Sequence, residues 1–204
     1  ETEKIVALSV AQTETVVGLF WRVANERGEA VALREKVRGV WRSISWRTYA
    51  DNARAVGLGL RALGLKRGER VAICSENRPE WLYCDMGILG AGGVSAGIYT
   101  TDSPQQIAYL VESSGARFYF AENDEQLDKC LMARERLGGL RNIIVFDTAG
   151  LGRVDDPLVI GFDSLIERGR AHGAANPGLW DDSLGRIQPN DIATLIFPSG
   201  TTGP

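Results

Sequence analysis

Histidine and cysteine are scarce in this sequence, and their scarcity excludes several kinds of active site. One histidine, His172, cannot supply a multi-histidine metal site, and we do not expect it to belong to a Ser-His-Asp hydrolase triad. The three cysteines, Cys74, Cys84 and Cys130, show no C-x-x-C spacing, so neither a disulfide framework nor a zinc site is indicated. We expect His172 on a surface loop and the cysteines in the core of a cytoplasmic protein.

Long hydrophobic runs and an excess of charge of one sign are also absent. The longest uncharged segment, Met86–Thr101, is interrupted by five glycines and does not have the composition of a transmembrane helix. A formal net charge of -3 gives no electrostatic reason to expect nucleic acid. We therefore expect no transmembrane segment and no nucleic-acid partner, whereas peripheral membrane contact and the oligomeric state stay open.

What the sequence does contain is an alternation of strand and helix signals typical of a parallel sheet. Strands separated by helices of ten or more residues predict an α/β fold, with a mainly parallel β-sheet flanked by helices on both faces. The 204 residues, 44% of them hydrophobic, suffice for a single α/β segment spanning 1–204. The expected strands are 31–34, 40–46, 71–74, 94–99, 117–121, 142–146 and 192–197.

Helix start and stop residues define the expected helices. Ser45 and Ser103 are predicted N-caps, the latter in a capping box with Gln106, and Pro79 is predicted in the first turn of a helix. Gly64 is predicted to end the helix that follows Ser45. The stretch 173–190, rich in Gly, Pro and Asp, is expected to be an exposed connection. The expected helices are 15–26, 46–63, 79–91, one that starts at 104, 124–137 and 162–170.

One glycine motif lies in the wrong context for nucleotide binding. Gly57, Gly59 and Ala62 match the G-x-G-x-x-A dinucleotide fingerprint, but they lie inside an amphipathic helix instead of between a strand and a helix. We reject the fingerprint and expect these glycines to permit close helix packing.

The most informative segment is the apolar run 192–197 together with the loop that follows it. The run has the composition of a buried parallel strand, and glycines and hydroxyl residues come directly after it. Backbone N–H groups and hydroxyls at such a turn form a cradle for anions, so the loop is a candidate polyphosphate site. A polar surface turn and the start of a Walker A motif are the alternatives that the residues leave open. The candidate residues are Ser199, Gly200, Thr201, Thr202 and Gly203.

The loop resembles the phosphate loop of the adenylate-forming superfamily, which includes acyl-CoA synthetases, luciferases and peptide-synthetase adenylation domains. Further blocks extend the resemblance over almost the whole chain and point to the long-chain fatty acyl-CoA synthetase branch: N-R-P-E-W (77–81), G-I-L-G-A-G-G-V (87–94) and G-I-Y-T-T-D-S-P-Q-Q-I-A-Y-L-V-E-S-S-G-A (97–116). The sequence departs from the family at Pro198, where a hydroxyl residue or glycine is usual, so a contact made there is lost.

The resemblance implies a function and a set of cofactors. It implies that the chain is the N-terminal portion of the large domain of an enzyme that uses ATP and Mg²⁺ to activate a fatty acid as an acyl-adenylate, and then transfers the acyl group to coenzyme A. It places residues 199–203 on the β- and γ-phosphates and the remaining catalytic parts after residue 204. We therefore expect residues 1–204 alone to be inactive. A non-catalytic nucleotide- or acyl-binding relative is the other reading that stays open.

Overall fold

The molecule is built around a parallel sheet, with a separate two-stranded hairpin beside it. The computed structural model describes residues 14–152 and 156–197. The sheet has six strands in the order β7-β6-β5-β3-β4-β8, and every adjacent pair is parallel. The strands are β3 (Arg70–Cys74), β4 (Val94–Ile98), β5 (Ala116–Ala121), β6 (Asn142–Val145), β7 (Val159–Gly161) and β8 (Thr194–Leu195).

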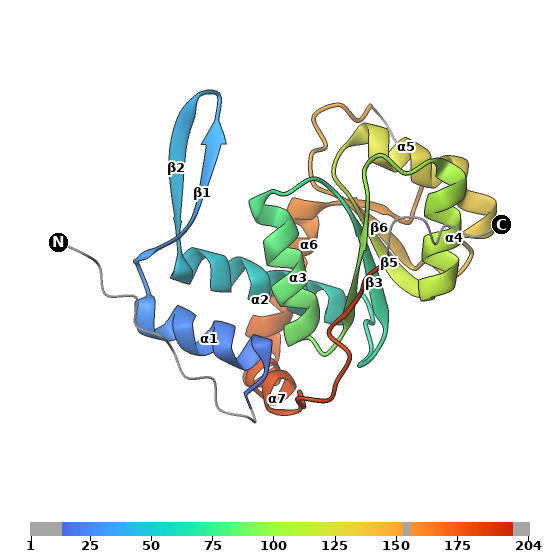
Figure 1. Cartoon of the computed structure of the whole chain (residues 1–204). Coiled ribbons are helices and arrows are strands. Elements are labelled where there is room, and N and C mark those ends of the chain that lie inside the picture. Colours follow the sequence, from blue (N-terminus) through green and yellow to red (C-terminus); the bar gives the residue numbers. More distant parts are fainter. Residues whose placement is uncertain (1–13, 153–155, 198–204) are drawn as a thin grey trace.

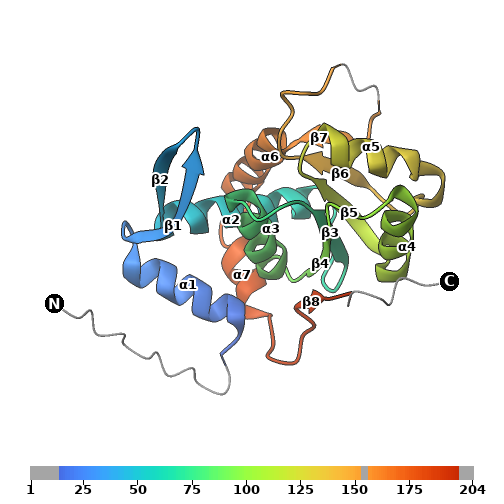
Figure 2. The same cartoon turned by 45° about the horizontal axis from the view of Figure 1, so that its top comes forward.

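Helices cover both faces of this sheet, as Figures 1 and 2 show. On one face lie α1 (Val16–Arg27), α2 (Trp46–Ala62), α3 (Pro79–Gly90), α6 (Phe162–Ala175) and α7 (Leu179–Gly185). On the other lie α4 (Pro104–Ser114), α5 (Asp124–Met132) and a short 3-10 turn at Arg134–Arg136. The predicted α/β architecture is therefore confirmed.

Alternation along the strands divides the core between these two faces. In β5, Phe118 and Phe120 pack against the layer that contains α2 and α3, whereas Tyr119 and Ala121 pack against α4 and α5. All four side chains are completely buried. Because successive side chains point to opposite faces, a strand covered on both sides is apolar at every position.

Local capping explains where the helices begin. The Ser45 hydroxyl accepts a hydrogen bond from the Thr48 N–H at 3.2 Å, and Ser103 and Gln106 form the predicted capping box at the start of α4. Pro79 is the first residue of α3, where its missing N–H removes no helical hydrogen bond. The three cysteines are buried and free, as expected.

Close packing of α2 against its neighbours confirms the interpretation of the helical glycines. A Cβ at Gly57 would lie 2.5 Å from the Gly87 carbonyl oxygen and 2.5 Å from the Trp180 ring. A Cβ at Gly59 would lie 2.5 Å from the Leu165 carbonyl oxygen. The glycines therefore allow α3, α6 and α7 to approach the α2 backbone directly.

Two expectations about the second half of the chain were wrong. The stretch 173–190 is not a simple exposed connection, because it contains the end of α6 and the whole of α7, whose Trp180 is 5% exposed. Trp180 fills the space left by Gly57 and Gly90, a tertiary contact that the Gly- and Pro-rich composition does not reveal. His172 consequently lies in the last turn of α6 and not in a loop.

The final apolar run also differs from its prediction. Only Thr194 and Leu195 pair with β4, and the side chains of Ile192 and Ile196 are 65% and 80% exposed. This segment lies at the edge of the sheet, next to β4 alone, so the described residues cover it incompletely. The strand β7 was not predicted, because three half-buried residues are too short for a periodic signal.

Candidate functional site

The carboxyl ends of the parallel strands form the candidate site. In open parallel sheets ligands bind beyond this edge. Since β8 is parallel to β4, its carboxyl end lies at the same edge as those of β3, β5 and β6. Phe197, the last described residue, packs beside the core under α4 and α5. The predicted phosphate-binding residues Ser199, Gly200, Thr201, Thr202 and Gly203 lie outside the described residues.

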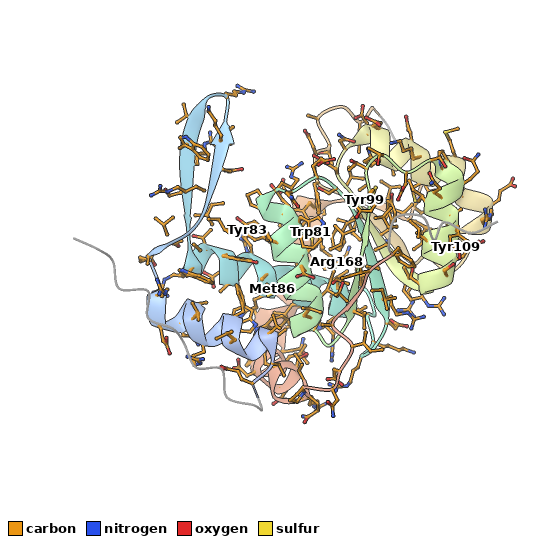
Figure 3. The ribbon with its side chains drawn as sticks, in the orientation of Figure 1. Trp81, Tyr83, Met86, Tyr99, Tyr109 and Arg168 are labelled. Carbon is orange, nitrogen blue, oxygen red and sulfur yellow. The ribbon has the colours of Figure 1, made fainter. Side chains whose placement is uncertain are left out.

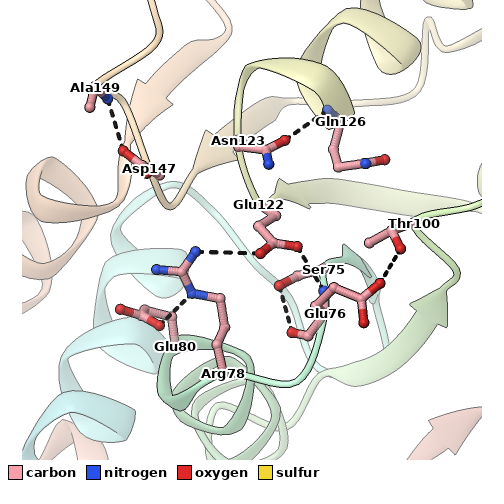
Figure 4. A network of polar contacts seen from close by, with 10 residues as sticks. All are labelled: Ser75, Glu76, Arg78, Glu80, Thr100, Glu122, Asn123, Gln126, Asp147 and Ala149. Carbon is pink, nitrogen blue, oxygen red and sulfur yellow. Dashed lines mark hydrogen bonds and ion pairs between the residues drawn. The ribbon is translucent and has the colours of Figure 1, made fainter. Parts of the chain in front are cut away.

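A polar network connects the loops that leave the strands at this edge (Figure 4). Glu122, directly after β5, accepts a hydrogen bond from the backbone N–H of Glu76 at 2.8 Å. Arg78 Nη1 lies 3.7 Å from Glu122 Oε1, and Arg78 Nε donates to Glu80 Oε2 at 2.6 Å. Glu122 thus ties the loop after β3 to the end of β5.

The loop after β4 joins the same network. The Thr100 hydroxyl donates a hydrogen bond to the Glu76 carboxylate. Lys129 of α5 donates to the Thr100 carbonyl oxygen at 2.6 Å and lies 3.0 Å from Glu125. Through Thr100 the network reaches the strand that borders β8. The neighbouring residue Tyr99, labelled in Figure 3, is exposed.

Electrostatics keep Arg78 positively charged within this network. Burial opposes its charged form, but the hydrogen bond and charge of Glu80, with the charges of Glu122 and Asp147, outweigh burial and raise its pKa. Its guanidinium carbon also lies 5.6 Å from the centre of the Phe146 ring, at the end of β6. Arg78 therefore links the ends of three strands, which is a positioning role.

Asp102 has a different environment from Glu80 and Glu122, which pair with Arg78. Its Oδ2 atom is buried and has no hydrogen-bond partner among the described residues. Burial raises the pKa of Asp102, although the Tyr99 backbone and the charge of Lys129 partly offset this. The charged form of this carboxyl group is therefore less favoured than that of an exposed aspartate.

The described part of the chain holds no cluster of three or more His, Cys, Asp or Glu side chains that could bind a metal ion. Among the same residues, none of the helices is both long enough and apolar enough to cross a membrane.

A cavity of about 460 Å³ lies between the start of α1 and residues 187–193, beside Gly68 and Val94 at the amino ends of β3 and β4. It is therefore at the opposite end of the strands from the candidate site.

Sequence reasoning missed the network residues, although a signal for them exists. Glu76, Glu122 and Asp147 each follow a buried strand by one or two positions, where a charged side chain reaches the ligand edge of a parallel sheet. The contacts of Arg78 and Thr100 hold loops in place at the edge, so these two residues have a structural role.

Comparison with known proteins gives consistent results. Residues 20–204 match the family model described as AMP-binding enzyme. The chain is 32% identical over 193 residues to the long-chain-fatty-acid–CoA ligase ACSBG2 of Xenopus laevis, a match that covers 93% of this chain and 25% of the relative. It is 29% identical to the long-chain-fatty-acid–CoA ligase FadD15 of Mycobacterium bovis, covering 96% of this chain and 31% of that protein.

Solved structures show the same fold. Coronafacic acid ligase from Pectobacterium brasiliense superimposes with a TM-score of 0.73 at 18% identity, covering 89% of this chain and 33% of that one. The anthranilate CoA ligase AuaEII in complex with anthranoyl-AMP superimposes with a TM-score of 0.66 at 24% identity, covering 78% and 29%. The chain therefore spans about a quarter to a third of the length of these relatives.

Proposed function

This chain belongs to the AMP-binding enzyme family, and from that premise we propose that it is the N-terminal part of an ATP-dependent long-chain fatty acyl-CoA synthetase. The observation that carries the proposal is the similarity to long-chain-fatty-acid–CoA ligases over 93% of the chain. Family membership also favours an adenylate-forming loop over a Walker A motif at residues 199–203. The cytoplasm is the proposed location.

The reaction that we propose has two steps. A carboxylate oxygen of the acid attacks the α-phosphorus of ATP, the bond to the β-phosphate oxygen breaks, and pyrophosphate leaves. The thiolate of coenzyme A then attacks the carbonyl carbon of the acyl-adenylate and displaces AMP. Adenylation is needed because a carboxylate has no good leaving group.

In this proposal the loop after β8 holds the β- and γ-phosphates. The backbone N–H groups of 199–203 and the hydroxyls of Ser199, Thr201 and Thr202 would donate hydrogen bonds to them, and Gly200 and Gly203 would let the backbone approach. Bound Mg²⁺ would neutralise charge on the departing pyrophosphate. The network of Arg78, Glu122 and Thr100 would support this loop by fixing the neighbouring strand ends.

Pyrophosphate exchange tests the proposal. The full-length protein, given ATP, Mg²⁺ and a series of fatty acids, should incorporate labelled pyrophosphate into ATP, with the fastest exchange for long chains. Thr201→Ala should slow the exchange by about 10²-fold, since one donor to developing charge contributes that much in comparable sites. Ser164→Ala, an exposed hydroxyl on α6, is the matched control and should leave the rate unchanged.

Two results would contradict the proposal. Nucleotide binding without exchange for any acid would make the protein a non-catalytic relative. Formation of acyl-CoA by residues 1–204 alone would show that the catalytic parts do not lie after this segment.

A further inference from the structure

The hairpin of β1 (Val31–Val37) and β2 (Val40–Ser45) is the part of the molecule that the proposed function does not use. Within 14–152 and 156–197, its strands pair with each other and with no strand of the main sheet. In Figures 1 and 2 it projects as an arm from the helices beside it. Arg38 and Gly39 form its turn, with φ values of 48° and 84° that match a tight two-residue hairpin turn.

The two faces of the hairpin have different environments. Residues directly opposite each other in the register share a face. Leu33 lies opposite Ile44, and this face packs against the core formed with α2 and α3. Lys36 lies opposite Trp41 and Arg34 opposite Ser43, and these four side chains are exposed. We call Arg34, Lys36, Trp41 and Ser43 the outer face.

The outer face and the turn combine unpaired positive charge with exposed apolar surface. Among the described residues, Arg34, Lys36 and Arg38 have no carboxylate within 4.0 Å, and the one acid of the hairpin, Glu35, lies on the inner face. Trp41 is 65% exposed; Val40, next to the turn, is 64% exposed but lies opposite Val37 on the inner face. The Lys36 Nζ atom lies 6.0 Å from the centre of the Trp41 ring.

Another exposed apolar side chain shows that this combination is not general on the surface. Met132, at the end of α5, is 77% exposed and also has three cations near it in sequence. Each of these is neutralised: Lys129 pairs with Glu125, Arg134 with Asp156 and Arg136 with Glu112. The hairpin therefore presents an uncompensated positive surface where α5 does not.

We propose that the outer face and tip of this hairpin dock on the surface of an anionic lipid bilayer. Tryptophan is favoured at the level of the lipid headgroups, where its ring is buried and its N–H stays hydrated. Lys and Arg beside it gain attraction to anionic headgroups while their stems cover apolar surface. Arg34, Lys36 and Arg38 would contact lipid phosphates, and Trp41 would enter the interface.

An anionic bilayer agrees with these features better than nucleic acid does. Three cations provide few of the phosphate contacts on which nucleic-acid affinity depends. A bilayer interface also accommodates the exposed ring of Trp41. The proposal needs only this surface and is independent of the enzyme activity proposed above.

Vesicle binding by the full-length protein tests the docking surface. Co-sedimentation should show binding to vesicles of phosphatidylcholine with 30% phosphatidylglycerol and little binding to phosphatidylcholine alone. The triple variant R34Q/K36Q/R38Q should weaken binding by about 10- to 100-fold, since each basic residue near an anionic surface contributes about a tenfold or smaller factor. Trp41→Ala should weaken it by about tenfold.

Matched controls separate docking from general charge and from misfolding. R168Q/R170Q/R186Q also removes three exposed arginines that have no ion pair among the described residues, and it should keep wild-type binding. Trp41→Phe keeps an aromatic ring, so its binding should fall less than that of Trp41→Ala. Quenching of tryptophan fluorescence by brominated lipid should nevertheless decrease in Trp41→Phe, because Trp41 is the residue expected in the interface.

Three outcomes would overturn the proposal. The first is a wild-type protein that does not bind anionic vesicles. The second is vesicle binding that hairpin and control variants reduce equally. The third is binding to single-stranded RNA that the hairpin variants abolish while vesicle binding persists.

Discussion

β5 and the segment that contains β8 are similar in sequence but differ in burial. Both are almost continuously apolar, yet Phe118, Tyr119 and Phe120 of β5 are completely buried whereas Ile196 is 80% exposed. β5 lies between β6 and β3 and has helices on both faces, but in the part of the chain that the structure describes β8 borders only β4. The comparison teaches that an apolar strand is buried by its neighbours and that its own composition only permits burial.

The largest expected effect contrasts these two strands directly. Phe120→Ala in residues 1–204 should lower the free energy of unfolding by about 3–5 kcal/mol, because it leaves a cavity in a completely buried site. Ile196→Ala should change it by less than about 0.5 kcal/mol, since the side chain is mostly in water. Urea denaturation followed by circular dichroism measures both; equal losses would show that β8 is covered after all.

A second expectation concerns the layer of helices that buries β5. A Cβ at Gly169 of α6 would lie 1.9 Å from the Ala55 carbonyl oxygen of α2, so Gly169→Ala must push the two helices apart. We expect a loss of about 1–3 kcal/mol in thermal or urea unfolding. Gly185→Ala, at the end of α7 where a Cβ would meet nothing within 4 Å, is the control. A fully stable Gly169→Ala protein would show that the α2–α6 contact is looser than described.

The smallest expected effect concerns an ion pair between Arg141 and Glu69 at the amino ends of β6 and β3. Arg141, just before β6, donates to both carboxylate oxygens of Glu69, just before β3, at 2.8 and 2.7 Å. Burial raises the pKa of Glu69, but the hydrogen bonds from Arg141 and the Lys66 backbone outweigh burial and lower it. The segment before β8 has a contact of the same kind, between Asp191 and Arg67 at 2.6 Å, but these two side chains are more exposed than Glu69 and Arg141.

The sign of the pH dependence follows from this lowered pKa. The stabilisation from Glu69 is fully present above its unfolded-state pKa of about 4.3 and is lost as the pH falls through the lower folded-state value. Glu69→Gln should therefore cost about 0.5–1 kcal/mol near neutral pH and show a weaker loss of stability below about pH 4. Urea unfolding between pH 3 and 7 measures this, with Glu167→Gln as the exposed control. If Glu69→Gln loses as much unfolding free energy between pH 4 and pH 3 as the wild type does, the ionised Glu69 side chain does not stabilise the fold.

Much of the fold was predictable because its signals are local. Ser45, Ser103 and Gln106 satisfy the first N–H groups of their own helices, and Pro79 begins α3, so their positions follow from neighbouring residues. The alternation of strands and helices likewise predicted the parallel sheet, because parallel strands need a long crossover. The family resemblance of the 77–116 blocks needed no coordinates either.

Other features depend on contacts between distant residues and could only come from the tertiary structure. Part of the expected loop forms α7, and the ring of its Trp180 packs where a side chain at Gly57 or Gly90 would lie. Gly57 and Gly90 are more than 85 residues away in the sequence. The network of Glu76, Arg78 and Glu122 exists because parallel pairing brings the ends of β3 and β5 to one edge.

Residue order alone is enough to predict the α/β class, the main helix starts and the resemblance of residues 199–203 to a phosphate loop. Which apolar strands are buried, and which exposed side chains share a surface as Trp41 and Lys36 do on the hairpin, follows from the folded arrangement. The physical reason is that capping and periodicity act over a few residues, whereas burial and charge compensation depend on what the rest of the chain places beside each group.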